Sequence, residues 1–143
     1  QRAYPDTEIK LVDMGTLSLK DTIRLMDETR IMFGLHGSAL WNVVFMHHTS
    51  ALVEIWPRGY FEEKYYNQAR FVDVTYIYEE AMIGNSHGHN AWTIIPVTQA
   101  LRLFKLADTV VENKLQNLPA WGATFDTGRL LKSRQGLYNP SLG

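Results

Sequence analysis

The residues best placed to do chemistry form one short run, His36-Gly37-Ser38, between an apolar segment and a segment with helical spacing. Glycine in such a turn lets the backbone approach a ligand closely. The amides that begin a helix have no partner within it, and the helix dipole adds partial positive charge, so phosphate is a suitable ligand. Ser38 can cap the helix or bond a phosphate oxygen. His36 can donate to a diphosphate or accept a proton from a hydroxyl.

The same run also fits a structural turn, because glycine and serine are common between a strand and a helix. In that interpretation His36 bonds only to backbone. Glu54 offers a similar choice, since it stands within an apolar segment predicted to be a strand. It can bond ribose hydroxyls or support His36, or it can lie at a solvent-exposed end of the strand. The residue pattern leaves both choices open.

Three aromatic residues, Trp56, Tyr60 and Phe61, follow Glu54 closely. They can stack on a uracil ring, although packing in the core is the commoner role of aromatic residues in such positions. The pair His47-His48 fits a surface turn between a helix and a strand.

A metal site has weak support in the sequence. His87 and His89 stand two residues apart in a glycine-rich loop and can share a metal, but no third ligand is evident. An exposed loop near the site is the alternative interpretation. The chain has no Asp-x-Asp pair, the kind of carboxylate pair that holds a divalent cation on a diphosphate. We therefore expect no metal ligands.

Strand and helix patterns alternate along the chain and predict an α/β fold with a Rossmann-like, mainly parallel sheet and helices on both faces. Ser18 and Asp21 form a capping box for the first helix. Ligands of such sheets bind outside the carboxyl ends of the strands, where the His36 turn is expected. The predicted strands are residues 8–13, 31–33, 51–56, 71–78 and 92–95, and the predicted helices are residues 18–29, 60–70, one that begins at Ser38 and one that opens at Pro96. The helix from Ser38 is expected to turn five residues inward: Ala39, Leu40, Val43, Val44 and Phe45.

Composition fits one soluble domain of ordinary kind, with 143 residues, 45% hydrophobic and 20% charged. The net charge of −1 without a basic block argues against nucleic acid as a partner. The absence of cysteine excludes disulfides and thiolate zinc sites. No apolar run reaches the roughly 18 residues of a membrane span.

The chain is expected to divide into an ordered part and a tail. Residues 1–117 are predicted to form the domain, and residues 118–143 a segment that is irregular or disordered, because prolines, glycines and scattered charges interrupt any pattern there. The chain begins at Gln1 without an initiator methionine, which suggests a fragment or a processed form.

The motif around His36 resembles that of a known family, glycosyltransferase family 61. The resemblance rests on Leu35-His36-Gly37-Ser38-Ala39-Leu40, with Gly34 before it, and on Asn42, Phe45-Met46 and Val53-Glu54 after it. It extends over about positions 9 to 113. Trp41 and His47-His48-Thr49 depart from the family pattern, which leaves the sugar and the acceptor undetermined. The family includes protein O-linked N-acetylglucosamine transferases of the endoplasmic reticulum and plant xylosyl- and arabinosyltransferases of the Golgi.

The resemblance implies the carboxyl-terminal, nucleotide-sugar-binding half of a GT-B enzyme, in which two Rossmann-like domains enclose the active site. Such an enzyme transfers a sugar from a UDP-sugar to a protein or polysaccharide hydroxyl with inversion, and it needs no metal or other cofactor. By this resemblance His36 is the expected catalytic residue, and the substrate-binding residues are Gly37, Ser38, Ala39, Asn42 and Glu54. The general base for the acceptor hydroxyl is either His36 or a carboxylate in the upstream half.

The resemblance also implies the lumen of the Golgi or endoplasmic reticulum, with a membrane contacted only through a possible anchor outside this chain. The piece is expected to be inactive without its upstream half. The alternative is a non-catalytic module of Rossmann or flavodoxin-like form that binds a nucleotide, an anion or another protein.

Overall fold

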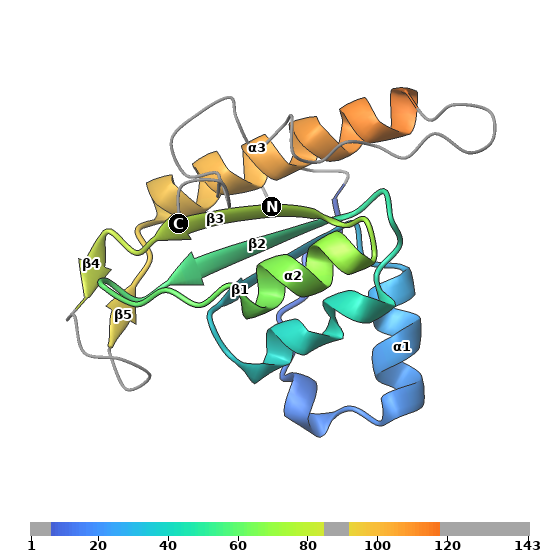
Figure 1. Cartoon of the computed structure of the whole chain (residues 1–143), viewed down its shortest axis with the longest axis horizontal. Helices are drawn as coiled ribbons and strands as arrows, with labels where there is room; N and C mark the ends of the chain where they lie inside the picture. The colour runs from blue at the N-terminus through green and yellow to red at the C-terminus, as the bar shows by residue number, and fades with distance from the viewer. Residues whose placement is uncertain (1–6, 85–91, 118–143) are drawn as a thin grey trace.

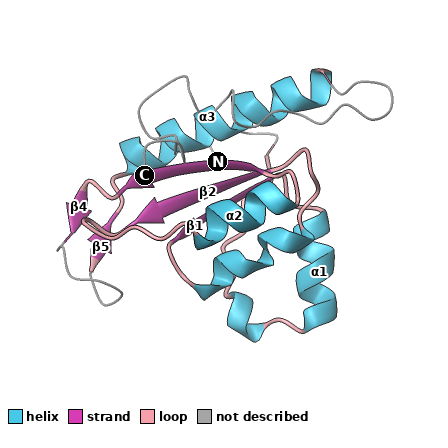
Figure 2. Ribbon diagram, in the orientation of Figure 1, coloured by secondary structure: helices cyan, strands magenta, loops and turns pink. Residues whose placement is uncertain are grey.

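The computed structural model describes residues 7–84 and 92–117. Within them, α-helices (α), 3-10 helices (η) and strands (β) alternate (Figure 1 and Figure 2). In chain order the elements are η1 (Met14–Thr16), α1 (Leu19–Asp27), β1 (Ile31–Leu35), η2 (Ser38–Phe45), β2 (Ala51–Trp56), α2 (Lys64–Phe71), β3 (Thr75–Glu80), β4 (Ile83–Gly84), β5 (Thr93–Ile94) and α3 (Val97–Gln116).

Three parallel strands form the main sheet in the order β1-β2-β3. Figure 1 shows α1, η2 and α2 on one face of this sheet and α3 on the other. All six residues of the central strand β2 are buried, as expected for a strand covered on both faces. The predicted α/β fold, with a parallel, Rossmann-like sheet between helices, is confirmed.

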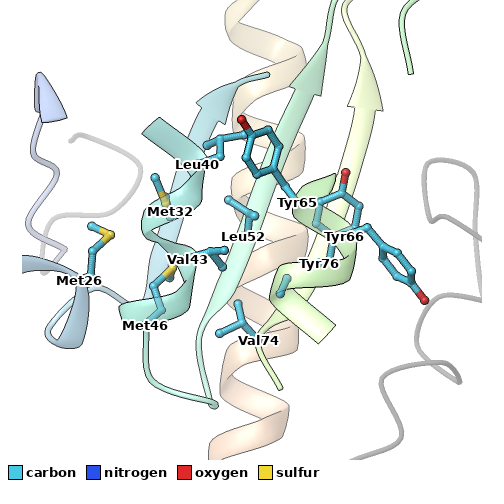
Figure 3. Close-up of a cluster of buried hydrophobic side chains, with 11 residues drawn as sticks. Met26, Met32, Leu40, Val43, Met46, Leu52, Tyr65, Tyr66, Val74 and Tyr76 are labelled. Atoms are coloured by element: carbon cyan, nitrogen blue, oxygen red, sulfur yellow. The ribbon is translucent and has the colours of Figure 1, made fainter. Parts of the chain in front are cut away.

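Alternation of side chains along the strands creates two apolar clusters, one on each face of the sheet. Leu52 points toward η2 and α2, where α1 adds Met26 (Figure 3). Ala51, Val53 and Ile55 point the other way, against α3. Because Glu54 is two residues from Leu52, its side chain belongs to the face that η2 and α2 cover.

The N-terminal segment contains one wrong and one confirmed prediction. The strand predicted for residues 8–13 does not form, and Ile9 and Leu11 are 56% and 104% exposed. An apolar spacing makes a strand only where another strand can pair with it, and none pairs with this segment within the described part of the chain. Ser18 is confirmed as the N-cap of α1, because Asp21 N–H donates to Ser18 Oγ over 3.2 Å. The Asp21 carboxylate accepts from the Ser18 hydroxyl over 2.6 Å, in place of the backbone N–H that a capping box uses.

The helix predicted from Ser38 forms as the 3-10 helix η2, and this changes which residues it buries. A 3-10 helix has three residues per turn, so positions three apart share a face. Leu40, Val43 and Met46 accordingly enter the core. Ala39 and Val44, which were expected to point inward, are exposed. Inward positions for Ala39 and Val44 follow from the α-helical period of 3.6 residues per turn, which this segment does not have.

The segment between α2 and β3 also differs from prediction. The predicted strand over residues 71–78 begins only at Thr75, because the C-terminus of α2 occupies the preceding residues. Val74 N–H donates to Ala69 O over 2.8 Å and Asp73 N–H to Arg70 O over 3.2 Å, with Asp73 left-handed at φ 57°. These two bonds are those of a Schellman motif. The helix predicted for residues 60–70 begins later, at Lys64.

The last elements lie outside the main sheet. The strand predicted for residues 92–95 is the short β5, which pairs antiparallel with β4 in a separate two-stranded ribbon. The helix that opens at Pro96 is α3, with Pro96 at its N-cap. His87, His89 and the predicted tail of residues 118–143 lie outside the described residues. No helix in the described ranges is long and apolar enough to cross a membrane.

Candidate functional site

His36 follows β1 directly and lies at the carboxyl ends of the strands, as predicted. Its backbone N–H donates to Ile55 O over 2.8 Å, which extends the β1–β2 pairing by one residue. Its side chain is 5% exposed. Because β1 and β2 are parallel and Gly34 pairs with Glu54, the last residues of both strands reach this edge together.

Glu54 contacts His36 directly. Its Oε1 lies 2.5 Å from His36 Nδ1, and its side chain is fully buried. The solvent-exposed strand end that was one interpretation of Glu54 is therefore wrong. A buried carboxylate is costly unless its oxygens are paired, so this contact is part of what makes the position of Glu54 possible.

Tyr76 on β3 supplies the second partner of Glu54. Its hydroxyl donates to Glu54 Oε2 over 2.5 Å, and Tyr76 is 3% exposed. Burial raises the pKa of Tyr76 well above that of an ordinary tyrosine, and the nearby charge of Glu54 raises it further. Tyr76 therefore stays protonated and can donate throughout the physiological pH range. Sequence reasoning missed this residue, because only the strand register brings it to Glu54.

Glu62 is a second residue that sequence reasoning missed. Its Oε2 lies 3.4 Å from His36 Nε2, so His36 stands between two carboxylates. Tyr60 O–H donates to Glu62 Oε2 over 3.0 Å, and Lys64 Nζ lies 3.2 Å from Oε1. The hydrogen bonds from Lys64 and Tyr60 lower the pKa of Glu62, so this group is ionised at neutral pH.

Aromatic rings flank the imidazole of His36. The rings of Tyr60 and Tyr65 lie 4.9 Å and 5.2 Å from it, centroid to centroid. Burial raises the pKa of Tyr65 to about 12, and the charges of Glu54 and Glu62 contribute. Trp41 meets Tyr65 edge-on at 6.4 Å and is 49% exposed. The imidazole is thus held in place by rings as well as by Glu54.

The turn after His36 opens to solvent. Ser38 and Ala39 are exposed, and Asn42 Nδ2 donates to Ala39 O over 2.8 Å. Gly37 is the N-cap of η2 and makes no side-chain cap bond, so Ser38 is the first helical residue and not the cap. A Cβ on Gly37 would have only Leu35 O nearby, at 3.8 Å. The space beside Gly37 is therefore open to a ligand.

Gly34 differs from Gly37 in this respect. A Cβ there would lie 2.8 Å from Leu40 Cδ2, so the lack of a side chain lets η2 pack closely against β1. The first glycine of the motif thus serves packing, and the second leaves space at the surface.

Trp56 and Phe61 pack together and do not line the turn. Trp56 is 5% exposed, stacks on Tyr78 at 4.3 Å and meets Phe61 at 4.1 Å. His47 and His48 are exposed in a turn at the amino end of β2, as the surface-turn interpretation predicts. Among the described residues, no group of three or more histidine, aspartate or glutamate side chains could hold a metal ion.

The chemistry available here is that of a held imidazole beside exposed amides. Leu40 N–H donates to Gly37 O over 3.0 Å, which forms the first turn of η2. Amides that precede such a bond have no partner within the helix and can bind an anion. Both nitrogens of His36 face carboxylate oxygens: a neutral imidazole can donate from one of them, and an imidazolium from both.

A comparison with known families finds one match. The family model described as Glycosyltransferase 61 matches residues 1–53, which include His36, the turn after it and Asn42. The match ends one residue before Glu54 and covers a shorter range than the resemblance over positions 9 to 113. It supports the resemblance to this family, and with it glycosyltransferase activity in general. Comparisons with curated proteins and with solved structures find no significant match.

Proposed function

We propose that this chain, whose residues 1–53 match the model of glycosyltransferase family 61, binds the UDP-sugar donor of an inverting glycosyl transfer. The observation that carries the proposal is the buried contact between His36 and Glu54 beside the first turn of η2. It places a fixed imidazole and exposed amides at one point of the carboxyl edge, where parallel α/β sheets bind their ligands.

In this proposal the diphosphate of the donor lies over Gly37, Ser38 and Ala39. The acceptor hydroxyl gives its proton to a carboxylate of the other domain and attacks the anomeric carbon from the face opposite the diphosphate. The bond from that carbon to the diphosphate oxygen breaks, and its electron pair stays on the leaving diphosphate. Negative charge therefore grows at the turn during the reaction, and fixed donors there lower the barrier. His36, which holds one proton on Nδ1 against Glu54, takes a second proton on Nε2 and donates a hydrogen bond from there to this charge.

Two further features belong to the proposal. The acceptor, a protein or a polysaccharide, is bound across a cleft whose second wall is the other domain of a GT-B enzyme, in the lumen of the Golgi or endoplasmic reticulum. Donor binding needs no divalent metal, because backbone amides and an imidazole donate hydrogen bonds to the diphosphate. Closure of two domains would exclude water from the donor.

The test is UDP binding, and transfer by the longer protein, in variants of His36. In His36→Asn the side-chain amide nitrogen takes the position of Nδ1 and can still bond Glu54, but no atom replaces Nε2. We expect UDP affinity and transfer to fall at least tenfold, about 1.4 kcal/mol, and His36→Ala to lose at least as much. His47→Ala, at the exposed turn, is the control and should match wild type.

Unchanged affinity and transfer in folded His36→Asn would remove His36 from the site. UDP binding that needs His36, without transfer by the longer protein, would favour the non-catalytic module. The metal question is a separate arm. Transfer should persist in EDTA, and a loss that manganese reverses would contradict metal-independent binding.

A further inference from the structure

We propose that Tyr76 is a positioning residue, which orients Glu54 so that His36 presents Nε2, and not Nδ1, to the ligand. The proposal rests on the proposed function and deepens it, because it explains which ring nitrogen of His36 is turned toward the ligand. It rests on three side chains from three adjacent strands or strand ends, His36, Glu54 and Tyr76, which form a continuous chain of contacts.

The register of the sheet creates this chain. Leu52 pairs with Tyr76 and Glu54 with Tyr78, so Tyr76 is the diagonal neighbour of Glu54 on the next strand. Their side chains lie on the same face of the sheet because the positions differ by an even number of residues. Figure 3 shows Tyr76 in the cluster that η2 and α2 cover, close to Tyr66.

Each oxygen of Glu54 has its own partner. Oε2 accepts from Tyr76 O–H, and Oε1 lies against His36 Nδ1, both at 2.5 Å. Because the Tyr76 hydroxyl stays protonated, it always donates its hydrogen bond to Oε2. This bond fixes the orientation of the Glu54 carboxylate. The other oxygen then lies 2.5 Å from His36 Nδ1, closer than the 3.4 Å between Glu62 Oε2 and Nε2, and favours a proton on Nδ1. The tautomer of an imidazole is set in this way by the partner of one nitrogen.

The surroundings prevent His36 from adopting another orientation easily. Its backbone N–H is bonded to Ile55 O, and its ring lies between those of Tyr60 and Tyr65. Nε2 consequently faces Glu62 and the start of α2. Tyr76 acts on His36 through Glu54, because one oxygen of Glu54 contacts each of them.

The experiment follows the two ring nitrogens of His36 by NMR of the chain labelled with ¹⁵N-histidine. The signal is assigned by its loss in His36→Asn. In wild type we expect Nδ1 to carry a proton. In Tyr76→Phe the Nδ1 proton should be less populated, because Glu54 loses the donor that fixes its plane. Tyr66→Phe is the matched control: Tyr66 is buried and packs edge-on against Tyr76 at 5.6 Å. It should leave the His36 signals unchanged.

Glu54→Gln gives a sharper outcome and a second route if Tyr76→Phe does not fold. Tyr76 should donate to the amide oxygen of Gln, which turns the amide nitrogen toward His36. Nδ1 must then accept, so the proton should move to Nε2. In the double variant Glu54→Gln, Tyr76→Phe this preference should weaken and both tautomers should appear.

Identical His36 signals in wild type and Tyr76→Phe would overturn the proposal and leave Tyr76 a packing residue. A Glu54→Gln variant that keeps its proton on Nδ1 would overturn it as well. These readouts need no ligand. Predicted tautomers together with absent UDP binding would therefore contradict the proposed function and not the role of Tyr76.

Discussion

At the scale of single residues, the site is an imidazole placed between an interior carboxylate and a peripheral one. Glu54 is fully buried and holds Nδ1, whereas Glu62 is 35% exposed and lies beside Nε2. His36 and Glu54 could be predicted from sequence, since both are polar residues in or next to apolar strands. Tyr76 and Glu62 could not, because only the register of β3 and the course of the loop before α2 bring them to the site.

Glu62 gives the prediction that belongs to this scale. Its carboxylate lies next to Nε2, where we place a diphosphate oxygen, so an ionised Glu62 must move or repel the ligand. Glu62→Gln should therefore tighten UDP binding several-fold, measured by calorimetry at low salt, where the charge effect is largest. Glu63→Gln, an exposed acidic neighbour, is the matched control. Weaker binding in Glu62→Gln would show instead that Glu62 contacts the donor.

At the scale of elements, η2 determines the shape of the site. Its position after His36 could be predicted from the Gly–Ser turn, but its 3-10 period could not, because the apolar residues also fit a period of 3.6. The predicted strand over residues 71–78 starts too early for a related reason, since β3 begins at Thr75. Val72 and Val74 favour a strand locally, yet the Schellman motif at Asp73 uses these residues to end α2.

The two glycines of the motif give a paired prediction at this scale. Gly34→Ala should lower the free energy of unfolding by about 1–3 kcal/mol, because its Cβ would overlap Cδ2 of buried Leu40, which must then move within the packed core. Gly37→Ala should keep stability near wild type, since its Cβ meets open space and its φ of 166° suits any residue. It should still weaken UDP binding by occupying that space. Urea unfolding and UDP titration of both variants measure this contrast, and equal stabilities would contradict the packing role of Gly34.

At the scale of the whole molecule, the two ends of the sheet serve different purposes. At the amino end, buried Lys114 of α3 donates from Nζ to His48 O over 2.7 Å and to Asp73 O over 2.6 Å. This joins α3 to the loops before β2 and β3 across the sheet. At the carboxyl end, the corresponding loops carry His36 and Glu62 and remain accessible at Ser38 and Ala39.

The overall architecture could be predicted well because alternating strands and helices leave few alternatives to a parallel sheet with helices on both faces. The strands expected at residues 8–13 and 92–95 could not be distinguished from strands of that sheet, although the first does not form and the second pairs with β4 in a separate ribbon. Periodicity shows which face of a segment is apolar, but it does not show which strand will pair with it.

The central claim is that the diphosphate of UDP binds at the turn after His36. Titration of the ¹⁵N-labelled chain with UDP tests it most directly, with amide shifts followed residue by residue. The largest shifts should occur at Gly37, Ser38 and Ala39, should saturate, and should be lost in His36→Asn. Shifts concentrated near Lys114 at the opposite end of the sheet, or no saturable shift at the turn, would contradict the claim.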